Sequence, residues 1–175
     1  WNYADAINPV HPFGIAAGPV TEGALALLTE WKSVRGLRPR LLEDWVWNSV
    51  WIPALHVVWA SVWASVGASV RALIWDSVWR SAKTEMSRID GMWNRMSRRD
   101  GMWNSVSEGM WNLVDAYIGS LFIPVVPEWR NNLYPLQAVV DLWRLGFVPS
   151  WDGNIWRLHA GTDGAIVWSG NNAVA

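Results

Sequence analysis

The chain has 175 residues, with fourteen basic and fifteen acidic side chains, no cysteine and seventeen tryptophans. That length allows one domain with its own hydrophobic core, a net charge of −1 gives no overall field that would recruit nucleic acid or an anionic membrane, and the lack of cysteine excludes disulfides, thiolate metal sites and a cysteine nucleophile. Tryptophan is far above its usual share of roughly one or two residues per hundred, so this enrichment needs a specific structural cause.

Residues 1–44 are expected to form an N-terminal unit of coil followed by a short helix. The prolines within the first nineteen residues favour irregular coil. Thr21 is placed to cap a helix that continues through Val34 and ends at Gly36. The chain opens with Trp1 instead of methionine, which suggests that the natural start is missing, and no signal-peptide pattern follows, which favours a soluble protein.

Residues 45–122 form a repeat array. A four-residue word recurs without interruption from Trp47 to Ala82, reading WNSV, WIPA, LHVV, WASV, WASV, GASV, RALI, WDSV and WRSA. A related word returns as IDGMWN, RDGMWN and EGMWN between residues 89 and 112. Valine is held in the last slot of most words, whereas the first slot accepts tryptophan, glycine and arginine. Such internal repetition usually indicates one structural unit per repeat.

The period of four favours strands over a helix. On an α-helix each word would advance by about 40°, so the valine stripe would circle the helix and no single face would stay buried. On strands a period of four keeps the stripe on one face, and every tryptophan from 45 to 111 sits at an odd position. We therefore predict a mainly β or α+β fold with a solenoid-like array, valine inside and the variable slot outside.

Paired long α-helices are the alternative for the array. Pro39 precedes an apolar pattern typical of a helix start. Trp111, Val114, Ile118 and Leu121 have the spacing of one helical face at the other end. These edge signals compete with the signal from the four-residue period.

A membrane span is a weaker alternative. Residues 52–70 contain a single ionisable side chain, His56, and tryptophans flank the segment. Arg71 and Asp76 follow soon after, and serines dilute the apolar character. Association with a membrane is therefore not favoured.

Residues 123–175 are expected to form a helix and a small antiparallel hairpin unit. Pro124 and Pro127 mark a linker, and an apolar helical stripe from Leu136 to Trp143 stops at Gly146. Beyond it, FVPSW, IWRLHA and AIVW are separated by the turn sequences DGN and GTDG. Alternating short segments of this kind predict two or three strands.

Several segments share a family resemblance. The segments ASVWASVGASVRA, WDSVW, AYIGSLF and DLWRLGFVPSWDGNIWRLHAG resemble tryptophan-rich proteins of phages and uncultured bacteria that are built from S-V-W-A/D words. The resemblance covers roughly residues 45–170, and the chain departs from it at WIPALHVV and throughout 80–99. It implies a tandem-repeat protein, and no activity comes with it.

No catalytic group, metal ligand set or cofactor is predicted. The histidines His11, His56 and His159 lie far apart and lack metal-binding spacing. His159, Asp163 and Ser150 could be drawn as a catalytic triad. A strand and its turn explain the same three residues more simply, so an enzyme is the less favoured class.

Basic and aromatic residues alternate between residues 80 and 103. The candidate binding residues of this region and of the array are Trp63, Trp79, Trp93, Trp103, Arg95, Arg98 and Arg99. Aromatic stacking together with arginine–phosphate contacts is how single-stranded nucleic acid is often held. Arginines that stack on tryptophans within the protein would account for the same pattern, so nucleic acid is possible but not favoured.

A row of outward tryptophans would leave a large apolar surface, which needs a cover. We therefore expect a non-enzymatic repeat protein that self-assembles, as a homo-oligomer, or binds a partner through this surface. One alternative is a small ligand-binding or catalytic unit in 123–175, where polar residues cluster around Trp151, Asp152, Arg157, His159 and Asp163. The other is weak binding of single-stranded nucleic acid by 80–103.

Overall fold

The computed structural model of the chain describes residues 4–5, 8–34, 52–86, 92–125 and 134–171. The helical elements are η1 (Pro12–Gly14), α2 (Glu22–Val34), α4 (Ile52–Val62), the π-helical turn η2 (Trp63–Gly67), α5 (Ala68–Met86), α6 (Met92–Ser120), η3 (Ile123–Val125) and α7 (Gln137–Arg144). The strands are β1 (Val148–Trp151), β2 (Ile155–Ala160) and β3 (Ala165–Asn171).

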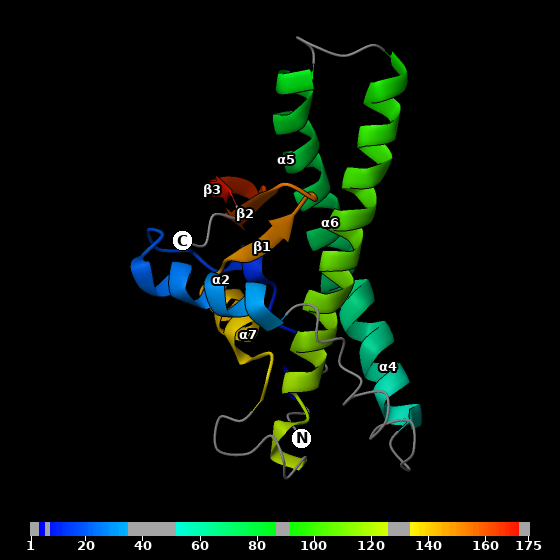
Figure 1. Ribbon diagram of the computed structural model, residues 1–175. Helices are drawn as coiled ribbons and strands as arrows, with labels where there is room; N and C mark the ends of the chain where they lie inside the picture. Colours follow the sequence, from blue (N-terminus) through cyan, green and yellow to red (C-terminus); the bar gives the residue numbers. More distant parts are fainter. Residues whose placement is uncertain (1–3, 6–7, 35–51, 87–91, 126–133, 172–175) are drawn as a thin grey trace.

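The prediction of a mainly β, solenoid-like array is wrong. The described part of the array is a helical hairpin, in which α4, η2 and α5 follow one another as the first arm and α6 is the second (Figure 1). The first arm crosses α6, so that α4 and α5 emerge on opposite sides of it. The alternative of paired long helices describes this region, and the fold as a whole is mostly helical with one small antiparallel sheet.

From residue 58 to residue 82, the valine slot faces the core along the first arm, as the sequence predicted for its side chains. Its members are all buried: Val58, Val62, Val66, Val70, Ile74, Val78 and Ala82. A stripe that drifts by about 40° per word on an α-helix can stay buried only if its cover changes. The cover does change, because α4 and η2 pack on α6, whereas α5 packs on both α6 and β3.

The π-helical turn also reduces the drift. A π-helix closes its hydrogen bonds over five residues in place of four and so takes more residues per turn than an α-helix. Across Trp63–Gly67 a word of four therefore falls short of a full turn, which moves the stripe back against the α-helical drift. The argument against a helix assumed one straight α-helix packed on one fixed neighbour. Neither assumption holds for the first arm, so its valine stripe stays buried.

The N-terminal helix matches its prediction. The backbone N–H of Ala24 donates to Oγ1 of Thr21 at 3.2 Å, so Thr21 caps α2. Ala24, Leu28 and Trp31 form its buried face, and α2 packs against α7. The expected end at Gly36 lies outside the described residues.

The C-terminal helix and strands are also confirmed. The helix α7 buries its apolar stripe, and the three strands form an antiparallel sheet in the order β1-β2-β3. Gly164 turns the chain into β3 with φ of 62°, and a β-carbon there would stand 3.0 Å from Cβ of Leu73 on α5. Glycine at this position therefore allows the turn to approach the hairpin closely. One hydrophobic core joins side chains of all three segments, among them Phe13, Val62 and Leu158.

The first arm also has the length and composition of a membrane span. The helical run His56–Lys83 has a mean hydropathy of 1.5 in its most apolar window, of which 33% is buried inside the protein. A core helix of a soluble protein passes the same test.

Candidate binding site

The tryptophans of the two arms stack on one another. The rings of Trp63 and Trp111 are 4.0 Å apart between centroids and nearly parallel, at 6°. Trp59 stacks on Trp111 at 5.4 Å, and its Nε1–H donates to Oδ1 of Asp115 on α6 at 3.0 Å. Because each ring lies against rings of the other arm or its own, much of the tryptophan surface is covered within the chain.

Arginines extend these stacks along the hairpin. The guanidinium carbon of Arg71 lies 5.6 Å from the ring centroids of both Trp63 and Trp103. The ring of Trp103 meets Trp75 edge-on at 4.7 Å. These contacts have the geometry of cation–π and aromatic pairs. The side chains in the first slot of the word therefore have specific partners, so this position does not accept every residue type equally.

The structure places the predicted binding residues in these stacks only in part. The rings of Trp63 and Trp103 both contact Arg71, with centroids 5.6 Å from its guanidinium carbon, and the guanidinium carbon of Arg99 lies 5.2 Å from the ring centroid of Trp79. Arg98 is exposed on α6. The side chains of the other two candidates, Trp93 and Arg95, lie outside what the structure describes. The described contacts are those of arginines that stack on tryptophans within the protein.

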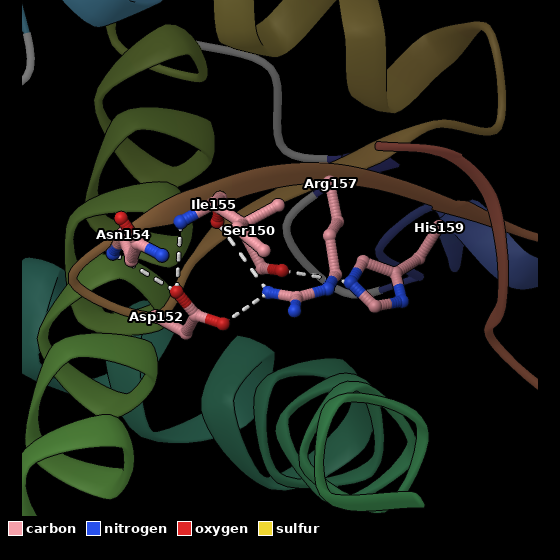
Figure 2. A network of polar contacts seen from close by, with 6 residues as sticks. All are labelled: Ser150, Asp152, Asn154, Ile155, Arg157 and His159. Carbon is pink, nitrogen blue, oxygen red and sulfur yellow. Dashed lines mark hydrogen bonds and ion pairs between the residues drawn. The ribbon is translucent and has the colours of Figure 1, made fainter. Parts of the chain in front are cut away.

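A second group of polar residues lies on β1 and β2. Figure 2 shows Ser150, Arg157 and His159 on the same side of the strands, with Asp152 at the end of the row. The antiparallel register explains this, because Ser150 is paired with Arg157 and Val148 with His159, so these side chains share one face.

His159 is a buried neutral base held by two hydrogen bonds. It is 0% exposed, and burial lowers its pKa to about 4. The hydrogen bond to the Gly164 carbonyl acts in the opposite direction, and the nearby charge of Arg157 adds a smaller lowering. Nδ1 lies 3.0 Å from the carbonyl oxygen of Gly164. A carbonyl can only accept, so Nδ1–H donates to it and Nε2 accepts the hydroxyl proton of Ser150 at 2.7 Å.

Asp152, the first residue of the DGN turn, forms a buried ion pair with Arg157 on β2. Nη1 of Arg157 lies 2.5 Å from Oδ2 of Asp152, with side chains only 4% and 8% exposed. The other carboxylate oxygen, Oδ1, accepts the backbone N–H groups of Asn154 and Ile155. The carboxylate thus holds both the turn and the guanidinium, as the dashed lines in Figure 2 show.

This arrangement does not have the properties of a catalytic triad. The carboxylate of Asp163 accepts the N–H of Ala165 in the exposed turn, whereas the histidine partner is the Gly164 carbonyl. A triad stabilises a charged imidazolium during the reaction. Around His159 both burial and the charge of Arg157 oppose that charge.

A hollow of about 240 Å³ opens beside Ser150, between α6, α2 and β1. Its apolar wall consists of Trp31, Pro149, Trp151 and Trp156. Its polar residues are Ser105, Glu108 and Asn112 on α6, Gly109 completes the lining on that helix, and Ser150 borders the hollow from β1. A β-carbon added at Gly109 would meet no atom within 4 Å. The hollow therefore combines indole rings with hydroxyl, amide and carboxylate groups.

Sequence reasoning identified one side of this site and missed the other. Trp151 and His159 stood among the residues of the 123–175 alternative, and Ser150 was named only as a member of the disfavoured triad. The residues on α6 were hidden because the array was assigned to strands. Read as a helix, positions 105, 108, 109 and 112 follow the i, i+3, i+4, i+7 spacing of one face. Among the described residues no group of three or more histidine, aspartate or glutamate side chains could hold a metal ion.

No protein-family model, curated protein or solved structure matches the chain.

Proposed function

We propose that the protein binds a small organic ligand in the hollow between α6, α2 and β1, without transforming it. The observation that carries this proposal is the lining, which brings three indole rings together with the polar residues Ser105, Glu108 and Asn112 of α6. Binding sites for small molecules combine apolar walls with a few placed polar groups in this way. The buried neutral His159 next to the hollow supports a binding role over a catalytic one.

The site is held in place before any ligand arrives. Ser150 is fixed by the hydrogen bond to His159, which is fixed in turn by the Gly164 carbonyl. The rings of Trp151 and Trp156 stack at 6.2 Å with 27° between their planes. Side chains that are already ordered lose little conformational entropy on binding, so the walls favour recognition of a fitting ligand.

The size of the hollow limits the ligand. A water molecule takes up about 30 Å³ of liquid, so a volume of about 240 Å³ corresponds to roughly eight waters. That is below the 300 to 1,000 Å³ typical of sites for drug-sized molecules. A single sugar or a single heterocycle fits this limit.

The test compares two glycine-to-leucine variants, one inside the hollow and one outside it as the control. Gly109→Leu places a side chain in the hollow, whereas Gly101→Leu makes the same change in the preceding copy of the word, where a β-carbon also meets nothing within 4 Å. A library of small fragments is screened by saturation-transfer NMR against both variants and the original chain. We expect fragments that bind the original chain and the Gly101 variant but not the Gly109 variant. Fragments that bind all three equally would refute the proposal.

Exposed rings on α6 favour a second candidate function, self-association or partner binding through the tryptophan-bearing surface. Trp103 and Trp111 are each 37% exposed, and Val57 on α4 is 70% exposed. These side chains leave apolar surface uncovered in one copy of the chain. Size exclusion with light scattering tests self-association. A molecular mass that rises with concentration for the original chain, while the Val57→Asp variant remains a monomer, supports this function. A monomer at all concentrations excludes self-association.

A further inference from the structure

We infer that the ligand of the hollow is a small organic cation, an ammonium group that carries alkyl substituents. This inference rests on the proposed function and adds the chemical class of the ligand. Two observations lead to it. A row of indole rings crosses the sheet and already binds one ammonium group of the chain, and the one ionisable side chain of the lining is a carboxylate.

Three tryptophans form a row across one face of the sheet. Trp151 of β1 is paired with Trp156 of β2, and their rings stack at 6.2 Å between centroids. Trp168 of β3 is paired with Leu158, which lies on the same face as Trp156. A β-carbon at Gly170, the residue opposite Trp156, would stand 2.6 Å from the indole of Trp168. The ring of Trp168 therefore lies over Gly170, on the other side of Trp156 from Trp151.

An ammonium group of the chain already lies against this row. Nζ of Lys32 on α2 is 5.4 Å from the ring centroid of Trp156 and 5.7 Å from that of Trp168. These are the distances of cation–π contacts. The described lining of the hollow contains Trp156 and Trp151 but neither Lys32 nor Trp168. The ammonium group of Lys32 therefore belongs to the β3 end of the row, and the hollow belongs to the β1 end.

The lining at the β1 end carries a negative charge. Glu108 of α6 is its one ionisable residue, and no basic side chain forms an ion pair with Glu108 among the residues that the structure describes. Its carboxylate therefore attracts a cation and repels an anion. Ser105 and Asn112 are uncharged, and each has an oxygen that can accept a hydrogen bond or solvate an ammonium group.

The two observations together favour a cation over a neutral or an anionic ligand. A neutral ligand gains nothing from the charge of Glu108, whereas an alkylammonium ion gains from that charge and from the attraction of an indole ring for a cation. Its alkyl groups also bury apolar surface on the rings. Trp151 is half-buried, whereas Trp31 and Trp156 are only 3% and 2% exposed. Because Lys32 holds a like charge beyond Trp156, we expect the ligand nearer to Trp151.

The experiment compares ligands of one shape and different charge. Choline has a trimethylammonium group, 3,3-dimethylbutan-1-ol is its uncharged carbon counterpart, and 3,3-dimethylbutanoate is an anion of similar shape. Each is titrated against the full chain by isothermal calorimetry, together with n-butylammonium as a primary ammonium and methyl glucoside as a neutral polar ring. For the about seven non-hydrogen atoms of choline we expect a dissociation constant on the order of 1 mM. The alcohol should bind at least about fivefold more weakly, and the anion should not bind.

NMR of the indole N–H groups locates the binding. Choline should shift the signals of Trp31, Trp151 and Trp156, which line the hollow. The signal of Trp103, which contacts Arg71 and Trp75 on the hairpin, should stay in place.

Two variants test the charge and the ring separately. Glu108→Gln should weaken choline binding about threefold to fivefold and leave the alcohol unaffected, with Glu22→Gln at the exposed start of α2 as the unaffected control. Trp151→Leu keeps an apolar wall but removes the ring, so it should weaken choline about fivefold more than it weakens the alcohol. Trp103→Leu makes the same change away from the hollow and should leave the affinity for choline as it was.

The outcomes separate this inference from the proposed function. Gly109→Leu should abolish choline binding, and Gly101→Leu should not. An affinity for choline that neither Glu108→Gln nor Trp151→Leu lowers overturns the cation assignment. A neutral ligand that Gly109→Leu excludes, with neither cation bound, also overturns that assignment and leaves the hollow as a ligand site. Cation binding that survives Gly109→Leu overturns both, as does the failure of these probes and of the fragment library to bind.

Discussion

The ring of Trp63 lies over the backbone of Gly67. A β-carbon at residue 67 would stand 2.5 Å from Cε3 of that indole, closer than carbon atoms approach without displacement. The same ring stacks on Trp111 of the opposite arm. Glycine in this slot therefore makes room for a ring that joins the two arms.

The first prediction concerns this contact. Gly67→Ala should lower the free energy of unfolding by about 1 to 2 kcal/mol, because the clash outweighs the gain in helix propensity. Gly101→Ala, where a β-carbon meets nothing within 4 Å, should raise it by about 0.5 to 1 kcal/mol. Urea unfolding followed by circular dichroism measures both. A gain in stability in both variants would show that Trp63 does not restrict residue 67.

The second prediction concerns the valine slot. Val66 is 2% exposed, so Val66→Asp should destabilise the protein by at least about 3 kcal/mol through burial of an unpaired charge. Ala64, two residues earlier, is exposed, and Ala64→Asp should cost less than about 0.5 kcal/mol apart from its lower helix propensity. Thermal or urea unfolding distinguishes the two, and equal losses would contradict the burial of the stripe.

The third prediction concerns pH. Burial lowers the pKa of His159 to about 4 from 6.5, so on acidification the unfolded chain takes up a proton before the folded one does. The resulting stability is fully present above pH 6.5 and is lost as the pH falls from there through 4. The loss should be on the order of 3 kcal/mol. Urea unfolding at a series of pH values measures it.

Two histidine variants control the pH experiment. His159→Gln should flatten the dependence between pH 6.5 and 4, because the titrating group is gone. His56 is exposed, and His56→Gln should leave the slope as it was. An unchanged slope in His159→Gln would assign the pH dependence to other groups.

The fourth prediction compares two ion pairs. Asp152→Asn should cost about 3 to 5 kcal/mol, because it leaves the buried guanidinium of Arg157 without its countercharge. Arg144 and Asp141 form an exposed pair at 4.0 Å, with side chains 53% and 41% exposed. Arg144→Ala should therefore cost less than about 1 kcal/mol. Comparable losses in the two variants would mean that the buried pair contributes no more than a surface pair.

The sequence predicted those helices and strands correctly whose formation depends on residues close together in the chain. Thr21 capping, the stripe of α7 and the glycine-containing turns between strands each depend on residues close along the chain. The sequence also marked Asp152, Arg157 and His159 as part of a polar cluster, and alternation on two paired strands brings them onto one face with Ser150.

The secondary structure of the array was predicted wrongly because it depends on contacts between segments far apart in the chain. The period of four excludes a straight helix against one neighbour, yet the chain combines a π-helical turn, a crossing of the arms and a second cover from β3. None of these is encoded in the word itself. The same error hid the lining on α6, because Ser105 and Gly109 share a face with Glu108 and Asn112 only on a helix.

Pairing of the arms through their repeated words has a consequence for how such a chain changes between generations. The words WASV and GASV differ at one residue, and tryptophan, glycine and arginine codons can be one base apart, so slippage of a copying polymerase over the twelve-base unit would add or remove whole words. One extra word lengthens an α-helix by about 6 Å. Added to the first arm alone, it would carry Trp59 and Trp63 past Trp111 and break the stacks. Added to both arms beyond the stacks, it would lengthen the hairpin and leave the sheet and the hollow unchanged. Inherited variants should therefore gain or lose words in matched pairs.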